Sequence, residues 1–251
     1  MDISNTFKQA FSNISGGRVL DVGTQEGGFV RVMMENFADC ADVTGIDIDA
    51  HSLGAARDTF DQKNVRFVQM DAERIGFCDE SFDTVAAAIV LHHLANVPRI
   101  LTEMMRVLRP GGHFIVSEMH RDAQTEPQHT VVQLHHWVAD MDNELGVPHY
   151  RTLARQEIMD FVADVGLEDV AHYDFSDVDS DPADEESIER VKDVISKFTQ
   201  RAEGLAGYEA FKQRGEEIER RLHEVGVQWE PVVVIVGKKP QGLGDLSPSP
   251  S

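Results

Sequence analysis

A glycine-containing turn is the part of this sequence best suited to hold a small ligand. The run V-L-D-V-G-T-Q-E-G-G-F extends from Val19 to Phe29, between a predicted strand and a predicted helix. Glycine lets the backbone approach a ligand closely at the carboxyl edge of a parallel sheet. Asp47 ends the next predicted strand, 20 positions after Gly27, which is the spacing expected of a carboxylate that binds a ribose. This pattern predicts a site for an adenosine-containing cofactor.

The charges of this turn separate two classes of adenosine cofactor. Gln25 and Glu26 stand where the dinucleotide motif G-x-G-x-x-G needs further glycine. An acidic residue there would repel a pyrophosphate at the N-terminus of the helix. S-adenosylmethionine has no phosphate, and its sulfonium and amino groups are cationic. Asp21 and Glu26 therefore favour S-adenosylmethionine over NAD.

Histidines that follow the fifth predicted strand form a second group of residues that could do chemistry. His129 and His136 are seven positions apart in a predicted helix, so they share one face. His135 falls beside them, and Asp140 follows His136 by four positions. Imidazole and carboxylate at such spacing can share a metal ion. Because no fixed metal-ligand pattern is present, we expect a polar pocket wall instead, and no metal site is predicted.

A general base is the third interpretation of these histidines. A neutral imidazole can accept a proton from a reacting hydroxyl or amine near physiological pH. The candidates for this role are His120, His135, His136 and His149.

The elements that must position these residues alternate between strands and helices. Short apolar segments alternate with helical patterns through the first half of the chain, which predicts a parallel sheet with helices on both faces. The predicted strands are 18–22, 43–47, 65–70, 81–89 and 113–117, and the helices are 28–39, 51–60 and 98–108. The helix over 98–108 begins with Pro98 and stops at the break Arg109-Pro110-Gly111-Gly112.

The regular alternation ends after the fifth strand. Helices are predicted over 125–142, 154–165, 188–198 and 208–225, and strands over 170–175 and 229–237. Asp181 and Pro182 are predicted as the N-cap and first residue of the third of these helices. Roughly 50 residues separate the last two strands, far more than an ordinary loop. The segment before the glycine turn is too short for a lid, so we expect 120–150 and 178–226 to supply a lid, a dimer contact, or both.

Five segments between Arg18 and Ser117 together resemble the ordered motifs of the class I S-adenosylmethionine-dependent methyltransferases, especially the small-molecule branch. Each segment alone is a weak signal, but five in the right order form a specific one. They are V-L-D-V-G-T-Q-E-G at 19–27, V-T-G-I-D-I-D at 43–49, V-Q-M-D-A at 68–72, F-D-T-V-A-A-A-I-V-L-H-H-L at 82–94 and R-V-L-R-P-G-G at 106–112.

The resemblance implies a role for each matching residue. Asp47 would accept hydrogen bonds from both ribose hydroxyls, with Ile48 against the adenine face. Asp71, which could equally cap the helix that follows it, and Ala72 would meet the adenine edge. The methionine end would be shaped by Asp21, Gly23, Thr24 and Gly27, with Ala88 and Ile89 near it. Gln25 replaces the family's second glycine, which leaves the loop conformation open and could bring Gln25 to the ligand or substrate.

The fold implied by the resemblance is a seven-stranded, mostly parallel, Rossmann-like α/β sheet with helices on both faces and helical cap insertions. The cofactor-binding core would occupy 1–119, with its completion at 154–177 and its last strand at 227–239. The expected insertions are a His-rich helical cap at 120–153 and a helical segment at 178–226. Residues 240–251, with their Gly, Ser and Pro, are expected to form a disordered tail.

The charge balance limits the classes of partner. With 23 Lys and Arg against 44 Asp and Glu, the net charge of −21 repels phosphate backbones and anionic membranes, so neither nucleic acid nor membrane is expected as a partner. Adaptation to high salt also produces such a surface. Two cysteines without metal-ligand spacing, and no N-terminal apolar run long enough for a signal peptide, lead us to expect a cytoplasmic location.

The function implied by the resemblance is methyl transfer from S-adenosylmethionine to a small-molecule nucleophile. The H-H-L stretch packs between strand and helix in this family, so His92 is expected to be structural, whereas His93 could face the substrate. A histidine would take the proton if the nucleophile is a hydroxyl or a protonated amine. Two alternatives remain open, a non-catalytic S-adenosylmethionine-binding regulatory module and a same-fold enzyme of other chemistry, such as aminopropyl transfer or NAD-dependent reduction.

Overall fold

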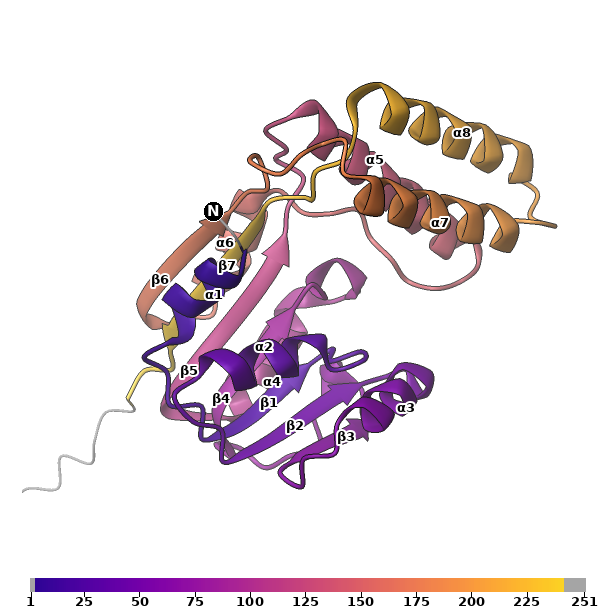
Figure 1. Ribbon diagram of the computed structural model, residues 1–251. Coiled ribbons are helices and arrows are strands. Elements are labelled where there is room, and N and C mark those ends of the chain that lie inside the picture. The colour runs from indigo at the N-terminus through magenta and orange to yellow at the C-terminus, as the bar shows by residue number, and fades with distance from the viewer. Residues whose placement is uncertain (1–2, 242–251) are drawn as a thin grey trace, which may run out of the picture.

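A seven-stranded sheet runs through the computed structural model, which describes residues 3–241. Its strand order is β3-β2-β1-β4-β5-β7-β6 (Figure 1). Strands β1 to β5 are parallel to one another, and β7 is antiparallel to both β5 and β6. The strands are β1 (Arg18–Val22), β2 (Asp42–Asp47), β3 (Val65–Gln69), β4 (Phe82–Ala88), β5 (Leu108–Met119), β6 (Glu168–Phe175) and β7 (Val232–Lys238). The predicted mostly parallel Rossmann-like sheet is confirmed.

Helices cover both faces of this sheet because successive residues of a strand point to opposite sides. In β1, Val19 packs on one face with residues of α1, α2 and α3, while Leu20 packs on the other with residues of α4 and α6. The central strand β4 is buried along most of its length, as its apolar run predicts. These helices are α1 (Ile3–Phe11), α2 (Gly28–Asn36), α3 (Ala50–Thr59), α4 (Val97–Val107) and α6 (Arg155–Ala163), with short 3-10 turns η1 (Ala72–Arg74) and η2 (Leu91–His93).

Three further helices form a separate cap beyond the sheet. They are α5 (Glu126–Glu144), α7 (Glu185–Arg201) and α8 (Tyr208–Val225), which pack on one another. Figure 1 shows them together beyond the end of the sheet toward which β5 points. Trp137 is fully buried among them, and its indole nitrogen donates a hydrogen bond to the backbone oxygen of Phe211 at 2.9 Å. The two insertions predicted at 120–153 and 178–226 therefore share one apolar core.

Two boundaries differ from those predicted. The sequence Arg109-Pro110-Gly111-Gly112 ends α4 but is no separate break, because β5 begins directly at Leu108 and includes all four residues. The N-cap of α7 is Asp184, whose carboxylate accepts the backbone N–H of Ser187 at 2.8 Å. The predicted cap Asp181 instead accepts the backbone N–H of Ala183 in the preceding turn.

The N-terminal segment contains a helix that the sequence analysis did not predict. Ile3–Phe11 forms α1, which packs against α2, β6 and β7. Phe7 and Phe11 stack, and Phe29 of α2 meets both ring edges. The helix was missed because its apolar positions gain stability only from these aromatic contacts with α2.

The far C-terminal segment lies mostly outside the described residues. Of the predicted tail at 240–251, residues 242–251 fall there. Among residues 3–241, no helix combines the length and apolar character needed to cross a membrane.

Candidate cofactor site

The glycine turn joins β1 to α2 at the point where the strand order reverses, which is where open α/β sheets bind ligands. Gly23 and Gly27 have φ angles of 73° and 81°, in the left-handed region that favours glycine. A Cβ on Gly23 would lie 2.3 Å from Val90 Cγ2, and one on Gly27 would lie 2.7 Å from Phe60. Both positions therefore require glycine for conformation and for space.

The structure shows the backbone conformation at Gln25, which replaces the family's second glycine. It also adopts a left-handed backbone, with φ 47°, which costs a non-glycine residue about 1 kcal/mol. Its backbone N–H donates to Asp47 Oδ2 at 2.9 Å, and Asp47 Oδ1 accepts the N–H of Asp49 at 2.9 Å. The Asp47 carboxylate thus holds the turn in the conformation that glycine would adopt more easily.

A cavity of about 420 Å³ lies beside this turn, at the carboxyl ends of β2 and β3. Asp47, Ile48, Asp71 and Ala72 line it, together with Gly23 and Gln25. The Ile48 side chain is 70% exposed, so an apolar surface faces open space there. Asp71 does both things that the sequence allowed, since it lines the cavity and also accepts the N–H of Glu73 as the cap of η1.

A second cavity, of about 440 Å³, shares Gly23 and Gln25 with the first. Thr24, Ala88 and Ile89 line it, so with Gly23 four of the six residues predicted at the methionine end lie there. Its remaining wall is mainly apolar and includes Ile3, Phe7, Phe29, Val32 and Val232. The two cavities thus border the same turn, and the linings of both are mainly apolar.

Ile89 carries unusual backbone strain at this second cavity. Its φ of 49° is rare for a β-branched residue, and its N–H donates to the backbone oxygen of Ser117 at 2.8 Å. Such strain persists only where the surroundings hold it, and it is often found at ligand sites.

Asp21 and Gly27 lie beneath the turn and line neither cavity. Asp21 is 1% exposed, and burial raises the pKa of its carboxyl to about 7, with the Thr24 hydroxyl lowering it in part and the nearby Asp47 raising it further. Thr24 fits above Gly45, where a Cβ would lie 2.6 Å from Thr24 Oγ1. Within residues 3–241, Asp21 Oδ2 has no hydrogen-bond partner.

The predicted catalytic histidines divide into three locations. His93, His135 and His149 meet His92 in one cluster, with ring centroids 4.2 to 5.5 Å apart for five pairs of these rings. Of these four, His93 lines the first cavity, and burial and the neighbouring imidazoles lower its pKa to about 3.

His120 and His136 lie apart from this cluster. His120 is buried, its Nδ1 lies 3.8 Å from Asp122 Oδ2, and burial lowers its pKa. His136 Nε2 lies 2.9 Å from the Thr152 hydroxyl, and burial lowers its pKa to about 4. Neither residue lines either of the two cavities.

The sequence analysis did not identify the buried carboxylates that contact the histidine cluster. Glu118 is fully buried at the end of β5, where it accepts the N–H groups of Val90 and Leu91 at 3.0 and 2.7 Å. Its other oxygen lies 3.0 Å from Nδ1 of His92, which is 1% exposed. A signal was present, since a glutamate following the apolar run F-I-V-S needs a partner when the strand is buried.

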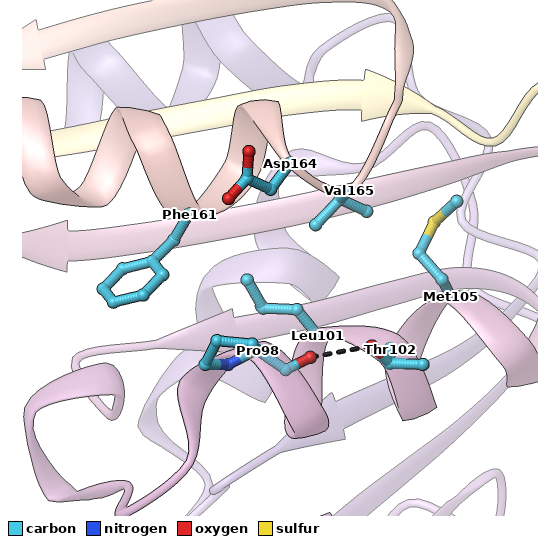
Figure 2. Close-up of a pocket in the computed structure, with 7 residues that line it drawn as sticks. All are labelled: Pro98, Leu101, Thr102, Met105, Phe161, Asp164 and Val165. Carbon is cyan, nitrogen blue, oxygen red and sulfur yellow. Dashed lines mark hydrogen bonds between the residues drawn. The ribbon is translucent and has the colours of Figure 1, made fainter.

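A third, smaller cavity of about 220 Å³ lies between α4 and α6, away from the glycine turn. Figure 2 shows Pro98, Leu101 and Phe161 among the residues that line it. Its lining is mainly apolar and holds none of the predicted site residues, so we assign it no part in the site.

Comparison with known proteins finds the same sequence core. Residues 20–116 match the family model described as a methyltransferase domain. Over 115 residues the chain is 35% identical to the ubiquinone/menaquinone biosynthesis C-methyltransferase of Pseudomonas paraeruginosa, a match that covers 44% of this chain and 45% of the relative. The chain thus matches less than half the length of that relative.

Solved structures share the fold over nearly the whole chain. The YcgJ protein of Bacillus subtilis superposes with a TM-score of 0.60 at 18% identity, over 95% of this chain and 98% of that one. Phosphoethanolamine N-methyltransferase 2 of Haemonchus contortus, solved with phosphomonomethylethanolamine and S-adenosylhomocysteine, gives a TM-score of 0.57 at 16% identity, over 95% of this chain and 52% of that one.

Proposed function

We propose that the chain transfers a methyl group from S-adenosylmethionine to a small-molecule nucleophile, since residues 20–116 match the family model described as a methyltransferase domain. One observation carries the proposal. Both cavities are lined by Gly23 and Gln25, so an elongated ligand that spans the turn would reach Asp47 at one end and Ile89 at the other.

The residues of the first cavity suit an adenosine group. Asp47 offers carboxylate oxygens to ribose hydroxyls, and charged acceptors make hydrogen bonds about twice as strong as neutral ones. The exposed Ile48 side chain suits an adenine face, and Asp71 and Ala72 lie where its edge would fall. The carboxylates around the turn suit a cationic ligand better than a phosphate, which supports S-adenosylmethionine over a dinucleotide.

The chain's own contribution to the reaction would be position and exclusion of water. When bound, S-adenosylmethionine supplies an electrophilic methyl group on its sulfonium. The turn and Ile89 would hold the methionine end, while Phe7 and Phe29 line the apolar side of the second cavity. An acceptor with an apolar body would bury there, and alignment of its nucleophile can supply most of the acceleration.

Fewer histidines are candidates for the acid–base role than the sequence analysis allowed. His93 is the one predicted catalytic histidine among the described residues that line the two cavities, so we retain it as the candidate proton acceptor. Its lowered pKa keeps the imidazole neutral at physiological pH but also makes it a weak base. Positioning would therefore outweigh proton transfer.

We also propose that the cap closes the cofactor site. Val147 and Pro148, in the segment after α5, line the first cavity opposite the residues of the sheet.

The strongly acidic surface supports a small molecule rather than nucleic acid as the substrate. Size measurement in solution would test the accompanying expectation of a dimer.

Titration calorimetry tests the cofactor half of the proposal. The chain should bind S-adenosylmethionine and S-adenosylhomocysteine, and Asp47→Ala should weaken binding about 100-fold, since two hydrogen bonds to a charged group contribute about 3 kcal/mol together. Asp61→Ala removes an exposed carboxylate after α3 and should leave the affinity unchanged. Binding of NAD instead would contradict the proposal.

Turnover tests the catalytic half. Incubation with S-adenosylmethionine and a panel of apolar hydroxyl, amine and carbon nucleophiles should release S-adenosylhomocysteine. Tight cofactor binding without turnover across the panel would favour the regulatory alternative.

A further inference from the structure

Three imidazoles meet between the methyltransferase core and the cap. His92 belongs to η2 after β4, His135 to α5, and His149 to the segment that follows α5. His92 is 1% exposed and His149 is 4% exposed. Three separate parts of the chain thus bring imidazole rings to one buried point.

The nitrogen atoms of these rings lie at distances that suit a common ligand. His135 Nε2 lies 3.2 Å from His92 Nε2 and 3.3 Å from His149 Nε2. Two nitrogens on a tetrahedral zinc ion, each about 2.05 Å from the metal, are about 3.4 Å apart. Ligand atoms of His92, His149 and the neighbouring His93 all lie within 4.8 Å of one another, so a fourth imidazole borders the same point.

Each ring has a buried carboxylate behind it. His92 Nδ1 lies 3.0 Å from Glu118 Oε1, and His149 Nδ1 lies 2.9 Å from Asp142 Oδ2. His135 Nδ1 lies 3.4 Å from Glu230 Oε1. Metal-bound histidines commonly donate their second N–H to a carboxylate, which orients the ring and raises its basicity.

The contacts between the rings leave room for a shared cation. When Nδ1 of His92 and of His149 donates to Glu118 and Asp142, Nε2 of each ring is left as an acceptor. Both face His135 Nε2, which can carry at most one hydrogen and cannot satisfy the two at once.

Glu230 supports the same conclusion. Its side chain is 5% exposed, and Oε1 has no hydrogen-bond partner in the part of the chain that the structure describes. A buried carboxylate without a hydrogen bond is costly unless a positive charge lies nearby.

We propose that His92, His135 and His149 bind a divalent transition-metal ion, with zinc the best match to three imidazoles at this spacing. Neutral imidazole is the ligand that zinc and its neighbours accept most readily, whereas magnesium and calcium prefer oxygen. The sequence analysis expected no metal site, because the ligands come from segments that share no spacing pattern.

The site would join the cap to the core. Pro148, next to the ligand His149, lines the cofactor cavity, and so does His93, next to the ligand His92. A metal at this point would fix the segment after α5 over the adenosine end of the site. Loss of the metal should therefore loosen that segment and weaken cofactor binding.

Metal content measured by mass spectrometry tests the site directly. The chain, purified without chelator, should hold about one zinc per molecule, and Co²⁺ exchanged into the chelator-treated protein should give the strong visible bands of a tetrahedral site. His135→Ala should lower the bound metal at least tenfold. His129→Ala, which changes an exposed histidine on the same helix, should bind as the unchanged chain does.

A variant that keeps all three ligands guards against misfolding as the cause. Glu230→Gln leaves the imidazoles in place. It should weaken zinc affinity roughly 10- to 100-fold, which is the usual effect of removing a carboxylate that supports a metal-bound histidine. Circular dichroism of each variant reports whether the fold persists. Wild-type protein that binds neither Zn²⁺ nor Co²⁺ stoichiometrically, or His135→Ala that binds both normally, would overturn the proposal. Metal content is measured without cofactor or turnover, so this outcome is independent of the methyltransferase assignment.

Discussion

The buried carboxyl of Asp21 should make the protein less stable at high pH. Its pKa is raised from an ordinary 3.8 to about 7 by burial, so the folded state binds a proton that the unfolded state releases. The stabilising effect of this proton is fully present below pH 4 and is lost as the pH rises through 7. At about 1.36 kcal/mol per pKa unit, the loss amounts to about 4 kcal/mol.

Replacement of Asp21 by Asn isolates this effect, because the amide has nearly the shape of the protonated carboxyl and does not titrate. Chemical denaturation of both proteins at about pH 4, 5.5, 7 and 8 gives the difference in their unfolding free energies across this pH range. Relative to wild type, Asp21→Asn should gain about 4 kcal/mol of stability between the lowest and highest pH.

Asp58→Asn, an exposed position on α3, serves as the control and should change stability by less than about 0.5 kcal/mol at every pH. A difference between Asp21→Asn and wild type that stays flat from pH 4 to pH 8 would refute the argument that burial raises this pKa.

Two further substitutions test the turn and the cap. Gly23→Ala should destabilise the fold by about 2–4 kcal/mol and abolish measurable cofactor binding, because of its left-handed φ and the 2.3 Å approach to Val90. Gly54→Ala, in open space on α3, should instead stabilise the fold by up to about 1 kcal/mol. Equal changes in unfolding free energy for Gly23→Ala and Gly54→Ala, measured by denaturant unfolding, would contradict the packing argument. Trp137→Ala should cost about 3–5 kcal/mol and release the cap, seen as faster amide exchange in α5, α7 and α8. Trp229→Ala is the control, because Trp229 is 37% exposed, and it should lower the free energy of unfolding by less than about 1 kcal/mol.

The core of the fold could be predicted from sequence because its signals are local. Strand β1 was predicted with its observed bounds, and β4 was found from an apolar run that only a buried parallel strand accommodates. The turn was found because glycine is favoured where the backbone adopts a left-handed conformation. The terminal boundaries of helices shifted by a few residues, as for α2, which ends at Asn36.

Other features depend on partners distant in the chain. Helix α1 was missed because its stability comes from rings on α2, and the cap of α7 was misplaced because Asp181 and Asp184 both suit that role locally. The helical spacing of His129 and His136 suggested a shared face, yet His129 is exposed and His136 contacts Thr152.

The glycine turn and the acids after β2 and β3 were determined by the sequence itself, because each depends on residues close together in the chain. Asp47 shows the limit of this reasoning, since its spacing predicted a ribose ligand but not its hydrogen bond to Gln25, which holds the turn. Only the tertiary structure could bring His92, His135 and His149 together and set a buried carboxylate behind each. Those contacts join residues up to 95 positions apart, as between His135 and Glu230, and no local pattern records which distant side chains share a buried space.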